Sequence, residues 1–134
     1  MIEIDIPGFG PVRLEHLVSD FTGTLSVDGM LLSEVDARLN KLSEVLKVHI
    51  LTGENHDVQK EDYVNKLGAG NVVALGNGKN DRKMLKAARI GIAVTEGEGC
   101  AVDAIMAADI HVRAALDGLD LLLNTKRCKA TLRY

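Results

Sequence analysis

Short apolar runs alternate along the chain with segments whose apolar residues recur at helical spacing. The runs have the length and the Val, Ile, Leu and Ala content of buried strands, and they are residues 14–18, 48–51, 72–75, 90–94 and 110–112. Strands that alternate with helices on short connections predict a parallel sheet with helices on both faces. The pattern therefore predicts an α/β fold, namely a three-layer, doubly wound, Rossmann-like parallel sheet.

Helical spacing identifies the segments that follow the strands. These segments are residues 33–46, 56–67, 84–88, 99–108 and 116–123. Ser33 is the predicted N-cap of the first helix, and Gly68 is the predicted stop of the second.

Two hairpins are predicted outside this alternation. Residues 1–13 contain an alternating strand, a Pro-Gly break and a second apolar stretch, which predicts a hairpin at an edge of the fold. Residues 25–32 contain two short apolar runs around an Asp-Gly turn signal, which predicts a small β-hairpin flap. Residues 124–134 are polar and basic, and we expect a solvated C-terminal tail that includes Cys128. Residues 1–134 are expected to form a single domain.

Polar side chains follow the predicted strands at the points where the strands end. Asp20 follows the first long strand, Thr52 follows the second, and residues 76–81 follow the third. Ligands of parallel, doubly wound sheets bind at the C-terminal ends of the strands. These polar residues are therefore expected to converge on one crevice.

A carboxylate, a hydroxyl, a lysine and a second acid around one point suit phosphoryl transfer. Asp20 can act as a nucleophile and form an acyl phosphate, while the Thr52 hydroxyl can hold phosphoryl oxygens. A lysine neutralises charge as the phosphoryl group is transferred. Magnesium, held by carboxylate and carbonyl oxygens near Asp81, would keep the anionic Asp20 and the anionic substrate together.

Several stretches resemble motifs of the haloacid dehalogenase (HAD) superfamily. Residues 20–25 (Asp-Phe-Thr-Gly-Thr-Leu) resemble its first motif in the Asp-Lys-Thr-Gly-Thr form of the P-type ATPases, and residues 51–53 (Leu-Thr-Gly) resemble the second. Residues 76–81 (Gly-Asn-Gly-Lys-Asn-Asp) resemble the Gly-Asp-Gly-x-Asn-Asp motif of the same ATPases, and residues 91–110 resemble the segment after it. The resemblance covers roughly residues 14–112 and points to soluble, P-type-ATPase-like phosphatases without a cap domain.

The resemblance implies roles for the residues that would contact the phosphoryl group. Asp20 corresponds to the catalytic nucleophile, and Thr52 with Gly53 corresponds to the phosphate-binding second motif. Lys60 best matches the catalytic, phosphate-binding lysine of the third motif, because that lysine precedes a Val and a Leu at a similar spacing. Lys66 is the alternative.

The resemblance also implies a magnesium site. Asp20, the Thr22 carbonyl, Asn77 and Asp81 occupy the positions of its ligands or of the residues that hold its water shell. Position 22 is also the catalytic position at which most HAD phosphatases carry a second aspartate, the general acid and base.

Three features depart from the family pattern. Thr22 cannot shuttle a proton near neutral pH, so turnover is expected to be slow and to favour good leaving groups, since general acid–base help is worth about 10²–10⁴-fold. Asn77 replaces an aspartate, so metal binding is expected to weaken, with Asp81 as a substitute ligand. The segment from Thr52 to Gly76 has room for about one helix and one strand, so we expect either a sheet that lacks a strand or an unusual crossover.

The sequence therefore predicts a magnesium-dependent phosphohydrolase that works through an aspartyl-phosphate on Asp20. The alternative is a HAD-fold binding or regulatory protein with little or no catalysis, which Thr22, Asn77 and the short segment from Thr52 to Gly76 favour. The substrate is expected to be a phosphorylated small molecule or a phosphoprotein. A homo-oligomer is expected only by analogy with capless HAD proteins.

Composition and charge exclude other classes. The formal net charge of −3 gives no support to a nucleic-acid binder. No apolar run approaches the roughly 20 residues of a membrane span, and no signal-peptide pattern is present. The cysteines suggest no disulfide framework, so a cytoplasmic location is predicted. The four histidines lack zinc-ligand spacing and are expected to be structural.

Overall fold

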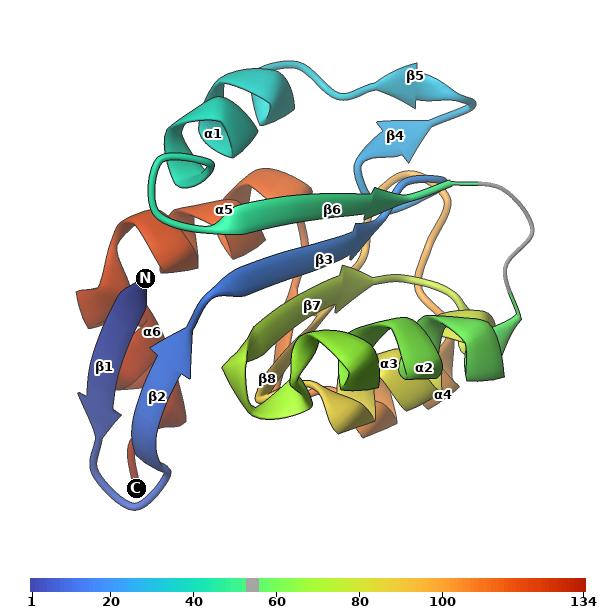
Figure 1. The fold of residues 1–134 in the computed structure, drawn as a ribbon. Helices are drawn as coiled ribbons and strands as arrows, with labels where there is room; N and C mark the ends of the chain where they lie inside the picture. Colours follow the sequence, from blue (N-terminus) through green and yellow to red (C-terminus); the bar gives the residue numbers. More distant parts are fainter. Residues whose placement is uncertain (53–55) are drawn as a thin grey trace.

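A five-stranded parallel sheet forms the centre of the computed structural model, which describes residues 1–52 and 56–134 (Figure 1). The strands are β3 (His16–Asp20), β6 (Lys47–Leu51), β7 (Val72–Gly76), β8 (Ile90–Val94) and β9 (Ile110–Val112), in the order β6-β3-β7-β8-β9. Each neighbouring pair is parallel. The five predicted strands are therefore confirmed.

Helices cover both faces of this sheet. On one face lie α2 (Asp57–Leu67), α3 (Arg82–Ala87) and α4 (Val102–Ala107), and on the other lie α1 (Val35–Leu42) and α5 (Ala115–Leu123) (Figure 1). Successive residues of a strand point to opposite faces. Leu17 accordingly belongs to the core under α1 and α5, whereas Val18 belongs to the core under α2, α3 and α4. The three-layer, doubly wound α/β fold is confirmed.

The crossover from β6 to β7 determines where α2 lies. The chain leaves β6 at the edge of the sheet, passes β3 and enters the sheet again at β7. In its described part this crossover contains α2 and a 3₁₀-helix, η1 (Ala69–Asn71), so the predicted room for one helix and one strand is confirmed. Val64 of α2 shares a buried cluster with Val18 of β3. The helix is therefore packed over the strand that ends at Asp20.

The predicted flap is confirmed as the hairpin of β4 (Ser26–Val27) and β5 (Met30–Leu31). Asp28 and Gly29 form its turn with φ values of 53° and 79°, the left-handed conformation that a two-residue hairpin turn requires at both positions. Ser33 is not the N-cap of the next helix. The cap is Glu34, whose φ of 69° redirects the chain from the flap into α1. The helix ends at Leu42, before the predicted position 46.

The N-terminal hairpin pairs β1 (Ile2–Ile6) with β2 (Gly10–Leu14), as predicted, but it forms a separate two-stranded sheet. Its alternating isoleucines are buried in the core under α1 and α5. The hairpin is therefore not an edge of the main sheet, and Glu15 alone separates β2 from β3.

The C-terminal residues correct the prediction of a solvated tail. Residues Thr125–Leu132 form α6, and Cys128 is fully buried in the main core. The backbone N–H of Tyr134 donates to the Pro7 carbonyl at 3.0 Å, which joins the chain end to the N-terminal hairpin. Most residues of this segment are polar, so its apolar face is hard to recognise in the sequence. That face consists of Cys128 and Leu132, which are four residues apart. Among the described residues, none of the helices has the length and apolarity of a membrane span.

Candidate active site

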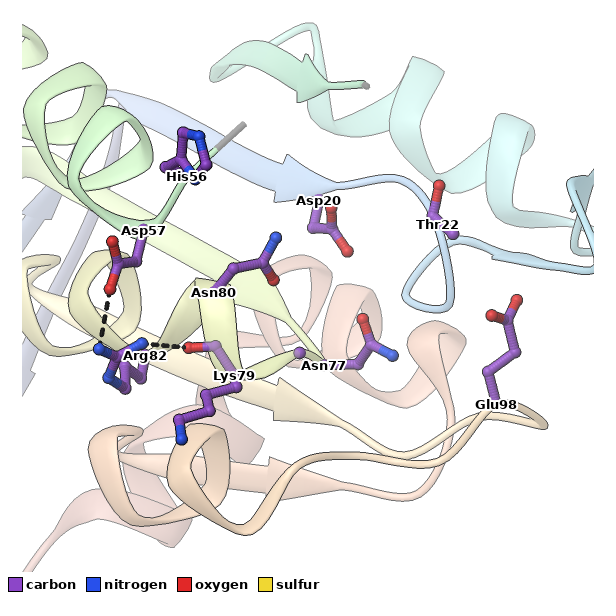
Figure 2. A pocket seen from close by; sticks show the side chains of 10 residues that line it. Asp20, Thr22, His56, Asp57, Asn77, Lys79, Asn80, Arg82 and Glu98 are labelled. Atoms are coloured by element: carbon purple, nitrogen blue, oxygen red, sulfur yellow. Dashed lines mark hydrogen bonds and ion pairs between the residues drawn. The ribbon is translucent and has the colours of Figure 1, made fainter. Parts of the chain in front are cut away.

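Asp20 is the last residue of β3, which lies between β6 and β7 in the sheet. Its carboxylate reaches the floor of an open pocket of about 850 Å³. The pocket is lined by Asp20, Thr22, His56, Asp57, residues 77–80, Arg82 and Glu98, which follow β3, β6, β7 and β8 (Figure 2). Asp20 and the loop after β7 therefore meet at one crevice, as predicted, whereas Thr52, which was also expected there, is not among the residues that line it.

Lys60 joins Asp20, which lines this crevice, to the buried Asp81. Its Nζ atom lies 3.1 Å from Asp20 Oδ1 and 2.6 Å from Asp81 Oδ1. The Lys60 side chain is only 2% exposed, because α2 packs over β3. Lys66 lies later on the same helix and is exposed. The structure therefore brings Lys60, and not Lys66, to the proposed nucleophile.

Asp81 is fully buried, and protein donors surround its carboxylate. Oδ1 faces Lys60, while Oδ2 accepts the backbone N–H groups of Asn77 at 3.0 Å and Gly78 at 2.9 Å. A Cβ atom on Gly76 would come within 2.6 Å of Asp81 Cβ, so glycine is needed there. The short 3₁₀-helix η2 (Lys79–Asp81) thus turns the chain so that the Asp81 carboxylate faces the backbone of Asn77 and Gly78. This geometry suits a residue that orients the loop and the lysine.

Thr24 connects Asp20 to the loop after β7. Its Oγ1 lies 3.1 Å from both Asp20 Oδ2 and Asn77 Oδ1. The Asn77 amide nitrogen donates to the Gly99 carbonyl at 3.1 Å, which turns Oδ1 toward Asp20. Sequence analysis did not select Thr24, although it is part of the stretch 20–25 that resembles the first HAD motif.

The donor set around Thr24 fits a magnesium ion. A hydroxyl carries one proton and can donate to only one of Asp20 Oδ2 and Asn77 Oδ1. The lone pairs of the other oxygen are then free for a cation. Magnesium takes hard oxygen ligands, keeps several waters and needs only one or two protein carboxylates. The described residues contain no group of three His, Cys, Asp or Glu side chains that would hold a metal ion. Asp20, Asn77 and the Thr22 carbonyl would hold it together with water and substrate.

The charges of the site act on one another strongly. Burial raises the pKa of the Asp20 carboxyl above its ordinary value of 3.8, and Asp81 raises it further, against the opposing effects of Lys60 and Thr24. Burial by itself would lower the pKa of Lys60. The contacts with Asp81 and Asp20 outweigh burial and hold that pKa above 10.5. Two carboxylates thus face one ammonium group, and a further cation would favour the ionised form of Asp20.

Comparison with known proteins assigns the chain to a family. The family model of haloacid dehalogenase-like hydrolases matches residues 32–106. The chain belongs to the haloacid dehalogenase-like hydrolases. It is also 38% identical over 100 residues to an uncharacterized protein of Methanocaldococcus jannaschii, across 75% of this chain and 98% of that relative. The predicted HAD resemblance is confirmed.

Solved HAD structures share the fold. The cobalt-bound deoxy-D-mannose-octulosonate 8-phosphate phosphatase of Haemophilus influenzae has a TM-score of 0.69 at 13% identity, over 91% of this chain and 94% of that one. The corresponding phosphatase of Moraxella catarrhalis, with magnesium, phosphate and its sugar acid, has a TM-score of 0.62 at 18% identity, over 90% and 94%. A zinc-transporting PIB-type ATPase in its E2.Pi state has a TM-score of 0.60 at 26% identity, over 75% of this chain and 20% of that chain.

The roles predicted for three further residues of this HAD hydrolase, Thr52, Gly53 and Thr22, stay predictions. Thr52 follows β6 at the same end of the sheet and is exposed, and its phosphate-binding role stays a prediction. Gly53 lies outside the described residues. Thr22 lines the pocket, and its role as a metal ligand through the carbonyl is likewise a prediction.

Several pocket residues of this HAD hydrolase were not predicted from the sequence. His56 and Asp57 begin α2, and Asp57 forms ion pairs with Arg82 at 2.8 Å and with Lys83 at 3.7 Å. Glu98 reaches the pocket from the segment after β8. No spacing marks these residues as a group, because three separate loops bring them together. His56 lines the pocket and caps α2, and its predicted structural role stays a prediction.

Proposed function

We propose that this HAD hydrolase is a magnesium-dependent phosphohydrolase that works through an aspartyl-phosphate on Asp20. The observation that carries the proposal is the position of one carboxylate at the base of an open pocket, between a buried ammonium group and a hydroxyl. Lys60 contacts Oδ1 and Thr24 contacts Oδ2. These contacts orient Asp20 for attack on a phosphorus atom in the pocket.

Two steps follow from this arrangement. In the first, an Asp20 oxygen attacks phosphorus, the bond from phosphorus to the leaving-group oxygen breaks, and an acyl phosphate forms. In the second, water attacks phosphorus and the bond to Asp20 breaks, which returns the carboxylate. Lys60 offsets negative charge in both steps, and Asp81 holds Lys60 in place. Bound magnesium would neutralise charge on the phosphoryl oxygens.

The remaining predicted residues are proposed to bind the phosphoryl group and the metal. We propose that Thr52 and Gly53 bind phosphoryl oxygens, and that Thr22, through its carbonyl, and Asn77 complete the metal site with Asp20. The oxygens of Asp81 already accept hydrogen bonds from Lys60, Asn77 and Gly78, so its proposed role is to position Lys60 and the loop.

The proposed substrates are phosphorylated small molecules or a phosphoprotein with a good leaving group. The pocket volume of about 850 Å³ lies within the usual range of small-molecule sites, about 300–1,000 Å³. Two of the structural neighbours are phosphatases of a phosphorylated sugar acid. Because Thr22 cannot protonate a leaving group, aryl and acyl phosphates are favoured over alkyl phosphates.

Hydrolysis of an aryl phosphate in the presence of magnesium tests the proposal. Asp20→Asn should reduce turnover to the uncatalysed background, and removal of the metal with a chelator should do the same. Asp36→Asn, which changes an exposed acid on α1, is the matched control and should keep the wild-type rate. Equal background in wild type and Asp20→Asn would contradict the proposal. It would instead favour the binding or regulatory alternative that Thr22 and Asn77 support.

A further inference from the structure

The pocket contains a carboxylate that the proposed function does not use. Position 22, where most HAD phosphatases carry their acid, is a threonine that cannot take up a proton near neutral pH. Glu98 lines the same pocket, although it comes from the segment between β8 and α4. In Figure 2 its carboxylate points toward the loop that carries Thr22. An acid is therefore present on the side of the pocket where the family position lacks one.

The segment that carries Glu98 is attached to the proposed site. The Gly99 carbonyl accepts the Asn77 amide at 3.1 Å, and the Ala101 N–H donates to the Asn77 carbonyl at 2.8 Å. Glu98 Oε2 accepts the backbone N–H of Asp28, in the turn of the flap, at 3.1 Å. Glu98 is thus held between the metal-side loop and the flap.

The Glu98 carboxylate keeps an oxygen for other chemistry. Among the residues that the structure describes, the Glu98 side chain makes one hydrogen bond, from the Asp28 N–H to Oε2, and no ion pair. Its side chain is exposed, so a proton taken up at Oε1 can pass to bulk water.

The other titratable groups of the pocket are less suited to this task. The pKa of Asp57 is lowered, against the effect of burial, by the backbone N–H of Val58 at Oδ1 and by Lys83 and Arg82 at Oδ2, so both of its oxygens are occupied. His56 lies at the start of α2, on the opposite side of Asp20 from Thr22 in Figure 2.

We propose that Glu98 is the general base of the second half-reaction, and this proposal rests on the proposed aspartyl-phosphate mechanism. Glu98 takes a proton from a water molecule in the pocket as the water oxygen forms a bond to phosphorus. The bond between phosphorus and the Asp20 oxygen breaks, its electron pair returns to the Asp20 carboxylate, and inorganic phosphate leaves. The proton then passes from Glu98 to solvent. A positioned base of this kind is worth about 10²–10⁴-fold.

Rapid-quench kinetics on p-nitrophenyl phosphate with magnesium separate the two half-reactions. The initial burst of nitrophenolate reports phosphorylation of Asp20, and the steady-state rate reports hydrolysis of the phosphoenzyme. Glu98→Gln keeps an oxygen for the Asp28 N–H but cannot take up a proton. This variant should keep the burst, lose about 10²-fold in the steady-state rate and accumulate phosphoenzyme.

Glu96→Gln is the matched control, because Glu96 lies in the same segment and its Oε1 also accepts a backbone N–H, from Ala115 at 2.7 Å. It should leave both phases at the wild-type rate. Glu98→Ala supplies a second measurement, since added formate should restore its steady-state rate if the missing group is a proton acceptor.

Each result decides the proposal. An unchanged steady-state rate in Glu98→Gln would overturn it. An equal loss of burst and steady-state rates, without rescue of Glu98→Ala by formate, would show that Glu98 only supports the flap and would also overturn it. If wild type shows no turnover that depends on Asp20, the proposed function fails, and this inference fails with it.

Discussion

Removal of the Lys60 ammonium group is the most direct test of the charge arrangement. Lys60→Met keeps a flexible apolar side chain in the same space but leaves the Asp20 and Asp81 carboxylates without their shared counterion. The Lys60 side chain is 2% exposed and that of Asp81 is 0% exposed, so water cannot replace the contact that Asp81 loses. The two contacts, at 3.1 and 2.6 Å, are charge-assisted hydrogen bonds.

The expected loss follows from these contacts. Each hydrogen bond to a charged group is worth about 1.5–3 kcal/mol, and loss of one partner from a buried ion pair costs about 3–5 kcal/mol. We expect the free energy of unfolding to fall by about 3–5 kcal/mol near neutral pH. That is a large part of the roughly 5–15 kcal/mol that stabilises an ordinary domain.

The loss should depend on pH with a defined sign. The pKa of Asp20 already lies above 3.8 in the folded protein, and removal of Lys60 raises it further. A folded carboxyl group with a raised pKa binds more protons than the unfolded one, so the variant loses stability as pH rises from 3.8 through that pKa. The contacts that raise the pKa of Lys60 stabilise wild type fully below pH 10.5. This stabilisation is lost only as the pH rises above that value. The cost of Lys60→Met should therefore be smaller at about pH 5 than at about pH 8, where both wild-type groups keep their charges.

Urea denaturation followed by circular dichroism at these two pH values measures the effect. Lys66→Met is the matched control, because it makes the same change at an exposed position on the same helix, where substitutions usually stay within about 0.5 kcal/mol. The reasoning is refuted if Lys60→Met and Lys66→Met agree within about 1 kcal/mol at both pH values, or if the cost is greater in acid.

Three further predictions use other residues of the site. Asp20→Asn should raise the urea midpoint at neutral pH, because burial and Asp81 raise the pKa of Asp20 and so make its charge unfavourable to folding; a lower midpoint would contradict this. Thr22→Asp should raise the rate of alkyl-phosphate hydrolysis by about 10²-fold, because it supplies an acid that protonates the poor leaving group, and an unchanged rate would show that this proton transfer is not limiting. Gly76→Ala should lower the free energy of unfolding by about 1–3 kcal/mol, because its Cβ would lie 2.6 Å from Asp81 Cβ. Gly70→Ala has no neighbouring atom within 4 Å and should change thermal unfolding little, so equal effects of the two glycine variants would refute the packing argument.

The sequence by itself determined the sheet, the flap and the position of Asp20. These features depend on local pattern: the continuous apolar runs of buried strands, the Asp-Gly turn and a carboxylate directly after an apolar run. Local pattern also contained a signal for the lysine. Lys60 lies four residues before the buried Val64 and shares its face of α2, whereas Lys66 does not.

Only the tertiary structure decided how the site is assembled. Sheet order places β7 beside β3 and β8 beside β7, which brings Asn77 to Thr24 and the Glu98 segment to Asn77. The buried side of α6 likewise depends on a core that the N-terminal hairpin helps to build. Contacts between distant residues depend on which strands are neighbours, and the periodicity of a single segment contains no information about its neighbours. The position of the proposed nucleophile, Asp20, is thus determined locally, while the groups proposed to control its charge and its protons are positioned by the fold.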